Sequence, residues 1–136
     1  MLLDTNIVIR YIRQNQPVPA RTIISVIVAA ELESIALRAA WGRQKLHNMQ
    51  AILERHKPIE LSVDLVPTYA RLDAYSQGKL PGQALPPGMS ARNMGKNDLW
   101  LATTAFYFQV PFYTTDRDFD HLAIVGLQLG NPEDLA

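Results

Sequence analysis

The sequence contains no cysteine, which excludes a disulfide scaffold, a zinc–thiolate site and a cysteine nucleophile. It also has no long hydrophobic run. The longest, residues 23–30, already contains Ser25 and ends at Glu31, far short of the about 20 residues of a membrane helix. No signal peptide is expected, because the acid Asp4 directly follows three apolar residues. We therefore expect a soluble, cytoplasmic protein with no membrane partner.

The net charge is zero, because 13 acidic residues balance 13 basic ones. A neutral total argues against a protein that coats nucleic acid non-specifically. The distribution is uneven: residues 1–57 hold eight bases and four acids, whereas residues 97–136 hold one base and six acids. This imbalance is compatible with an enzyme that has an acidic centre and a basic rim, and equally with an ordinary solvated surface.

Apolar residues make up 48% of the 136 positions, which suffices for the core of one domain spanning residues 1–136. Short apolar segments alternate with helical patterns, and this order is typical of an α/β fold with a mainly parallel sheet covered on both faces. Strands are expected near residues 1–3, 22–24, 59–61, 112–114 and 127–129, in the order 3-2-1-4-5. Helices are expected at 7–12, 25–40, 43–56 and 64–77, and from Asp98 onward with Asn97 as its cap.

Residues 78–95 are rich in glycine and proline and predict a long loop. Long loops in small domains are usually functional or mobile, and we expect this one to be mobile. It is not a domain boundary, because too little chain follows it to build a second core.

Four acids stand at unusual places. Asp4 and Asp116 follow predicted strands, so both belong at the carboxyl edge of the sheet, where open α/β sheets bind ligands. Asp98 lies at the start of a helix, and Glu31 lies two turns into another. Clustered carboxylates repel one another unless a divalent cation neutralises them, and Mg²⁺ and Mn²⁺ prefer such oxygen ligands.

Each acid also has a simpler explanation. Asp4 could serve only as a helix cap. Asp98 could only complement a helix dipole. Glu31 could lie on a solvated helix face. What favours a site is that separate acids are expected to converge on one sheet edge.

Four sequence blocks resemble the PIN-domain nucleases, and among them the VapC-type toxins of prokaryotic toxin–antitoxin pairs. The blocks are residues 2–7 (LLDTNI), 25–32 (SVIVAAEL), 97–102 (NDLWLA) and 114–120 (TTDRDFD). They occur in the order found in that family and span nearly the whole chain.

The resemblance implies a metal-dependent endoribonuclease with a PIN-like α/β/α sandwich around a five-stranded sheet. It implies a catalytic quartet of Asp4, Glu31, Asp98 and Asp116, in which Asp4, Asp98 and Asp116 hold Mg²⁺ or Mn²⁺. It implies supporting roles for Thr5, Asn6 and Thr115. The implied partners are an RNA substrate, a small VapB-like antitoxin and a second copy of the chain in a homodimer.

Residues outside these blocks receive no catalytic role. The histidines His47, His56 and His121 are expected at the surface or at helix ends, and Trp100 is expected to pack. Basic residues flanking the acidic edge could contact an RNA backbone or could simply be solvated; they are Arg10, Arg13, Lys79, Arg92 and Lys96.

The sequence is also compatible with three other functions. The first is a non-catalytic PIN-like module that binds RNA or protein. The second is a phosphohydrolase with Asp4 as nucleophile, although Asn6 stands where such a site would want a second aspartate. The third keeps the nuclease chemistry and replaces RNA with DNA.

Overall fold

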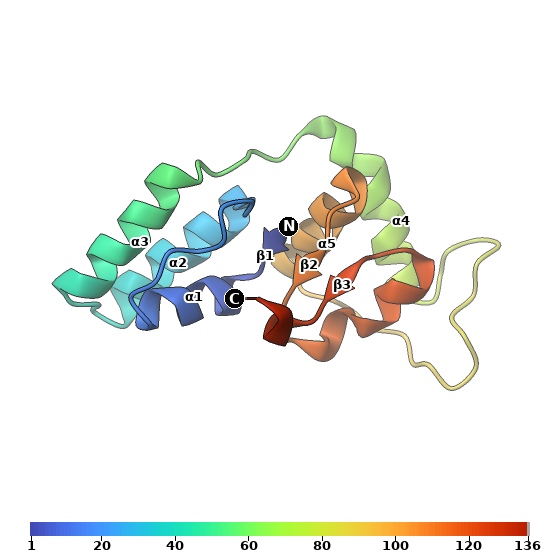
Figure 1. The fold of residues 1–136 in the computed structure, drawn as a ribbon. Helices are drawn as coiled ribbons and strands as arrows, with labels where there is room; N and C mark the ends of the chain where they lie inside the picture. The colour runs from blue at the N-terminus through green and yellow to red at the C-terminus, as the bar shows by residue number, and fades with distance from the viewer. Residues whose placement is uncertain (136) are drawn as a thin grey trace.

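The computed structural model describes residues 1–135, which fold around a small parallel sheet. Its strands are β1 (Leu2–Leu3), β2 (Phe112–Tyr113) and β3 (Leu129–Gly130), in the order β1-β2-β3. On one side of the sheet lie α1 (Thr5–Arg13), α2 (Val26–Arg38) and α3 (Arg43–Arg55). On the other side lie α4 (Val66–Ser76) and α5 (Lys96–Phe108) (Figure 1).

The predicted five-stranded sheet is not confirmed within residues 1–135. Two further segments join the three strands only through isolated parallel bridges, Leu2↔Ile23 and Ser25↔Ile59. The second bridge consists of two backbone hydrogen bonds, from the Ile59 amide to the Ile24 carbonyl oxygen at 2.8 Å and from the Val26 amide to the Ile59 carbonyl oxygen at 2.9 Å. The apolar segments thus occur as expected, but two of them pair over one residue each.

The sequence predicts Ser25 and Asn97 as helix caps, and the structure confirms only the first. The Ser25 hydroxyl accepts a hydrogen bond from the Ile27 amide at 3.1 Å and caps α2. Asn97, however, is not the cap of α5. Gly95 takes the extended cap conformation, so the helix begins at Lys96 and Asn97 lies inside its first turn. Asp98 still lies in that turn.

Three short 3₁₀ helices complete the fold: η1 (Val63–Leu65), η2 (Arg117–Val125) and η3 (Pro132–Asp134). Residues 78–95 form the predicted long loop, with turns but no helix or strand, and this loop extends away from the body (Figure 1). No helix within residues 1–135 is long and apolar enough to cross a membrane.

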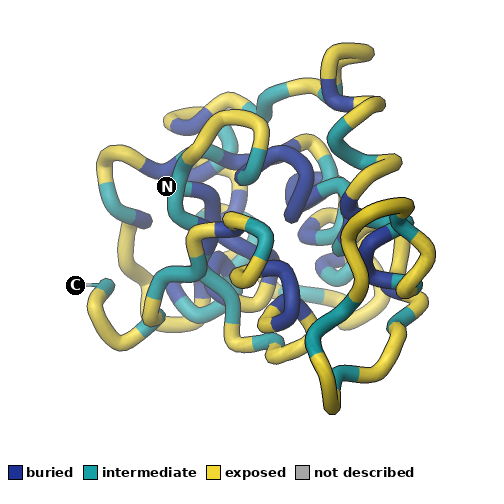
Figure 2. The backbone as a smooth tube through the Cα atoms, turned by 90° about the vertical axis from the view of Figure 1, so that its right-hand side faces the viewer, coloured by how far each residue is buried: buried dark blue, intermediate teal, exposed yellow. Residues whose placement is uncertain are grey.

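The strands β1 and β2 contribute to the core, and Figure 2 shows buried segments in the interior with exposed segments around them. Leu2, Leu3 and Phe112 are fully buried, and the rings of Phe112 and Phe119 meet edge to face with centroids 4.9 Å apart. Trp100 packs as predicted, with its ring centroid 4.2 Å from that of Tyr69. The short strands are therefore held by side-chain packing on both faces.

The histidines divide into three cases. His47 is exposed, and His56 ends α3 but is buried, with Nδ1 3.0 Å from the Thr22 carbonyl oxygen. The prediction of a surface or helix-end position is wrong for His121. That ring is buried inside η2, where its Nε2 lies 2.8 Å from the Ser76 hydroxyl. The contact with this polar partner offsets the free-energy cost of burying the ring.

Candidate active site

Asp4 occupies the junction between β1 and α1. Its Oδ1 accepts a hydrogen bond from the Thr5 amide at 2.7 Å, which caps α1. Its Oδ2 accepts a second bond at 2.6 Å from the Thr114 hydroxyl, and the Asn6 side-chain amide lies 3.4 Å away. Burial raises the pKa of Asp4, these hydrogen bonds oppose the rise, and the charge of Asp116 adds to it.

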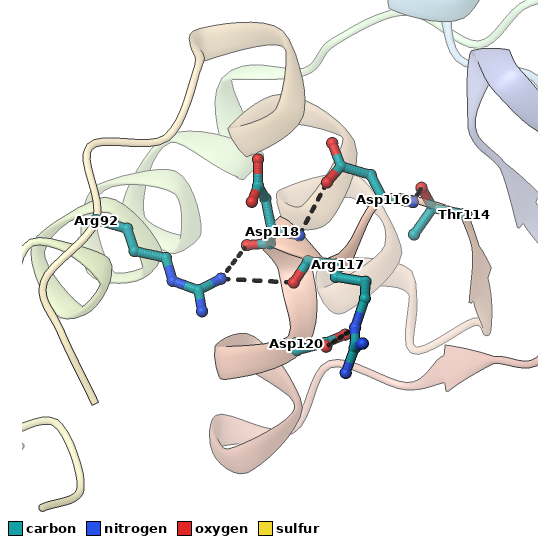
Figure 3. Close-up of polar contacts among 6 residues, drawn as sticks. All are labelled: Arg92, Thr114, Asp116, Arg117, Asp118 and Asp120. Carbon is teal, nitrogen blue, oxygen red and sulfur yellow. Dashed lines mark hydrogen bonds and ion pairs between the residues drawn. The ribbon is translucent and has the colours of Figure 1, made fainter. Parts of the chain in front are cut away.

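Asp116 follows β2, the strand that pairs with β1. Its Oδ1 accepts a hydrogen bond from the Asp118 amide at 2.9 Å and so caps η2 (Figure 3). Its own amide donates to the Thr114 hydroxyl oxygen at 3.0 Å. The same threonine therefore touches both strand-end acids.

Glu31 points from α2 toward the start of α1. Its Oε1 accepts a hydrogen bond from the Thr5 hydroxyl at 3.0 Å. Burial raises the pKa of Glu31, and the nearby charge of Asp4 raises it further. Thr5 thus touches Asp4 through its amide and Glu31 through its side chain.

Asp98 lies in the first turn of α5, where burial and the charges of the other acids raise its pKa. Burial raises its pKa to about 6, and the charges of Asp4, Asp116, Glu31 and Asp118 all contribute to that rise. Such mutual repulsion requires that the carboxylates lie near one another. Asp4 is thus linked to Asp116 through Thr114 and to Glu31 through Thr5, and Asp98 lies within range of their charges.

No basic side chain within residues 1–135 pairs with these acids. The one ion pair in that part of the chain joins Arg117 and Asp120 at 3.4 Å, on the surface. Carboxylates without a cationic partner are the ligands that Mg²⁺ and Mn²⁺ prefer, so the chemistry of the donor set fits such an ion. Among the described residues no three potential ligands yet stand close enough to form a metal cluster. An ion would therefore have to draw the carboxylates together.

The supporting residues follow the prediction only in part. The side chains of Thr5 and Asn6 contact the acids, whereas Thr115 is exposed and contributes its amide, 3.5 Å from the Asn6 Oδ1. Sequence reasoning missed the roles of Thr114 and Asp118. A threonine two residues before a helix-capping aspartate has the spacing of a side-chain turn, and this signal could have identified Thr114.

An open depression adjoins the acids at the N-terminus of α5. It is lined by residues 95–98 and has a volume of about 420 Å³. Lys96 and Asn97 are both exposed there, beside the half-buried Asp98. The acidic edge is thus reachable from solvent.

Comparison with known proteins agrees with this architecture. VapBC2 from Rickettsia felis, solved with a promoter DNA fragment, matches with a TM-score of 0.69 at 24% identity over 96% of both chains. FitAcB from Neisseria gonorrhoeae matches with a TM-score of 0.70 at 19% identity, over 98% of this chain and 99% of the other. VapBC-5 from Mycobacterium tuberculosis gives a TM-score of 0.61 at 23% identity, over 96% and 94%. At these identities the likeness concerns the fold.

A comparison with curated protein sequences gave no match. The profile of the PIN domain, in contrast, matches residues 1–125, which include all four acids. The match covers most of the chain, and the chain belongs to the PIN domain family.

Proposed function

We propose that the protein is a metal-dependent endoribonuclease and the toxin of a VapBC-type toxin–antitoxin pair. One observation carries the nuclease proposal: Asp4 is linked to Asp116 through Thr114 and to Glu31 through Thr5, and no basic side chain within residues 1–135 pairs with these acids. Carboxylates held together without basic partners repel one another, and a bound divalent cation would neutralise them. Membership in the PIN domain family supports the same activity.

In this proposal Asp4, Asp98 and Asp116 hold Mg²⁺ or Mn²⁺, and Glu31 either adds a ligand or orients the attacking water. When bound, the ion would activate water and neutralise charge that develops on the phosphodiester. Thr114 would hold Asp4 and Asp116 at a fixed separation through its two hydrogen bonds. The reaction needs no nucleophilic side chain.

The similar structures also suggest partners. The structures from Rickettsia felis and Mycobacterium tuberculosis are described as VapBC proteins, the latter as a member of a toxin–antitoxin family. On that likeness we propose a small VapB-like antitoxin as the partner of this chain. From the sequence resemblance we also propose a homodimer, and from the composition a cytoplasmic location. RNA is the proposed substrate.

Incubation of purified, partner-free protein with total cellular RNA tests the activity. Parallel reactions contain Mg²⁺, Mn²⁺ or EDTA, and one includes single-stranded DNA in place of RNA. Asp98→Asn reports on the site, and Asp64→Asn, an exposed aspartate of η1, is the matched control. We expect discrete, metal-dependent RNA cuts that Asp98→Asn abolishes and Asp64→Asn preserves. A folded wild-type protein that cuts neither nucleic acid would contradict the proposal and favour a non-catalytic binding module.

A further inference from the structure

Arg92, near the end of the 78–95 loop, is tied to two other elements at once. Its amide donates a hydrogen bond to the Ser76 carbonyl oxygen at 2.7 Å, and its carbonyl oxygen accepts one from the Ser76 hydroxyl at 3.0 Å. Ser76 is fully buried and is the last residue of α4. The main chain of Arg92 is thereby fixed to the end of α4.

The side chain of Arg92 reaches from the loop to the start of η2 (Figure 3). Its Nη1 donates to the carbonyl oxygen of Asp118 at 3.1 Å and lies 3.5 Å from that of Arg117. The amide of the same Asp118 donates to the Asp116 carboxylate. Residue 118 is therefore held on one side by Arg92 and on the other by a proposed metal ligand.

His121 reinforces this connection. The Ser76 hydroxyl has a single proton, and in the bond to Arg92 that proton is donated to the carbonyl oxygen. The contact of 2.8 Å between the Ser76 oxygen and Nε2 of His121 then requires Nε2–H as the donor. Ser76 therefore connects Arg92 to η2 a second time.

We propose that Arg92 is a positioning residue that fixes the 116–118 turn, and with it the Asp116 carboxylate, against the 78–95 loop. This inference rests on the proposed nuclease function. Both contacts come from Nη1, which carries two N–H donors in the fixed plane of the guanidinium, whereas the ammonium of a lysine sits on a more flexible stem. Hydrogen bonds from a charged donor are also stronger than neutral ones.

The same geometry indicates that Arg92 does not bind the substrate. Nη1 of its guanidinium already donates to backbone carbonyl oxygens, whereas Arg71 on α4 is exposed. Removing Arg92 should therefore lower the rate of the bound complex more than its affinity for RNA. Small displacements of a catalytic group can cost about 100-fold in rate, so the effect is measurable.

Two measurements on Arg92→Ala, Arg92→Lys and the charge-matched control Arg71→Ala test the inference. The first is amide hydrogen exchange at residues 116–120 without metal, which does not depend on catalysis. The second is steady-state cleavage of an RNA oligonucleotide with Mn²⁺, which separates kcat from KM.

We expect Arg92→Ala to speed exchange at residues 116–120 by about 10-fold, because charge-assisted hydrogen bonds are lost there. We expect its kcat to fall by about 10-fold or more, with KM changed by less than about 3-fold. Arg92→Lys should recover part of both effects, and Arg71→Ala should behave as wild type in both.

Unchanged exchange at the turn would overturn the inference, as would a raised KM with normal kcat, which would make Arg92 a substrate contact. Failure of the proposed function looks different, since wild-type protein would then cut no RNA. In that event exchange still decides whether Arg92 holds the turn.

Discussion

Thr114 and Asp4, 110 positions apart in the chain, are joined by a hydrogen bond of 2.6 Å from the threonine hydroxyl to Oδ2 of the aspartate. The same hydroxyl oxygen accepts the Asp116 amide at 3.0 Å. One side chain thus links acids that follow two paired parallel strands. The separation of these acids is set by a residue that is itself neither an acid nor a metal ligand.

Replacement of Thr114 by valine should impair cleavage while leaving the protein folded. The change keeps the shape of the side chain but removes the donor to Asp4 and the acceptor for the Asp116 amide. We expect stability to fall by about 1–2 kcal/mol and activity by about 10- to 100-fold. Denaturant unfolding and RNA cleavage measure the two effects.

Thr115→Ala provides the contrast, because the Thr115 side chain is exposed and only its amide approaches Asn6. Its activity should stay within about 3-fold of wild type, as is typical of surface substitutions. Equal losses in the two variants would show that the hydroxyl bridge has no special role.

The ionisation of Asp98 should make the metal-free protein less stable as pH rises. Its pKa in the folded protein is about 6, against an ordinary value of 3.8. A raised pKa favours folding while the group is protonated, so this contribution is present below about pH 4 and is lost as pH rises through 6.

Asp98→Asn should remove this loss of stability at high pH, because an asparagine side chain does not ionise. In EDTA the variant should match wild type near pH 4 and exceed its stability by roughly 1 kcal/mol at pH 7.5, an amount discounted for partial solvent screening. Urea unfolding at pH 4, 5, 6 and 7.5 measures the difference. A difference that does not change with pH would contradict the raised pKa.

Gly130 in β3 is expected to tolerate no side chain. It is paired with Tyr113 in the parallel register, and a Cβ at position 130 would overlap the Tyr113 ring. Gly130→Ala should therefore cost about 1–3 kcal/mol of unfolding free energy. In a Tyr113→Ala background the same change should cost much less, because the ring is gone. Thermal unfolding of the four proteins measures the coupling, and additive losses would contradict the contact.

The elements beside Asp4, Asp116 and Glu31 could be predicted from the sequence because each of these acids stands near a strong local signal. A short apolar segment ends directly at Asp4, and another ends shortly before Asp116, so both belong at a strand end. Ser25 has the side chain of a helix cap, and the start of α2 that it marks places Glu31 two turns along the helix. These signals depend only on neighbouring residues, and the structure has β1, α2 and β2 near the predicted positions.

What the sequence did not reveal depends on contacts between distant residues. An apolar segment such as residues 22–24 does not show how many of its residues will pair, and Ile23 forms a single bridge. The burial of His121 depends on Ser76, 45 positions away, and the role of Thr114 depends on Asp4. Gly95 replaced Asn97 as a cap because backbone conformation, not side-chain type alone, decides where a helix begins.

Direct titration of the purified, metal-free protein with Mn²⁺ is the most immediate test of the central claim that the four acids form one divalent-cation site. Isothermal calorimetry at pH 7.5 should show saturable binding. Binding should be lost or weakened by at least about 10-fold in Asp98→Asn and Asp116→Asn and retained in Asp64→Asn. Near pH 6 binding should also release protons, because the pKa of Asp98 is about 6 and its carboxylate must ionise to bind the ion. Absence of binding by a folded wild-type protein, or equal binding by all four proteins, would contradict the claim.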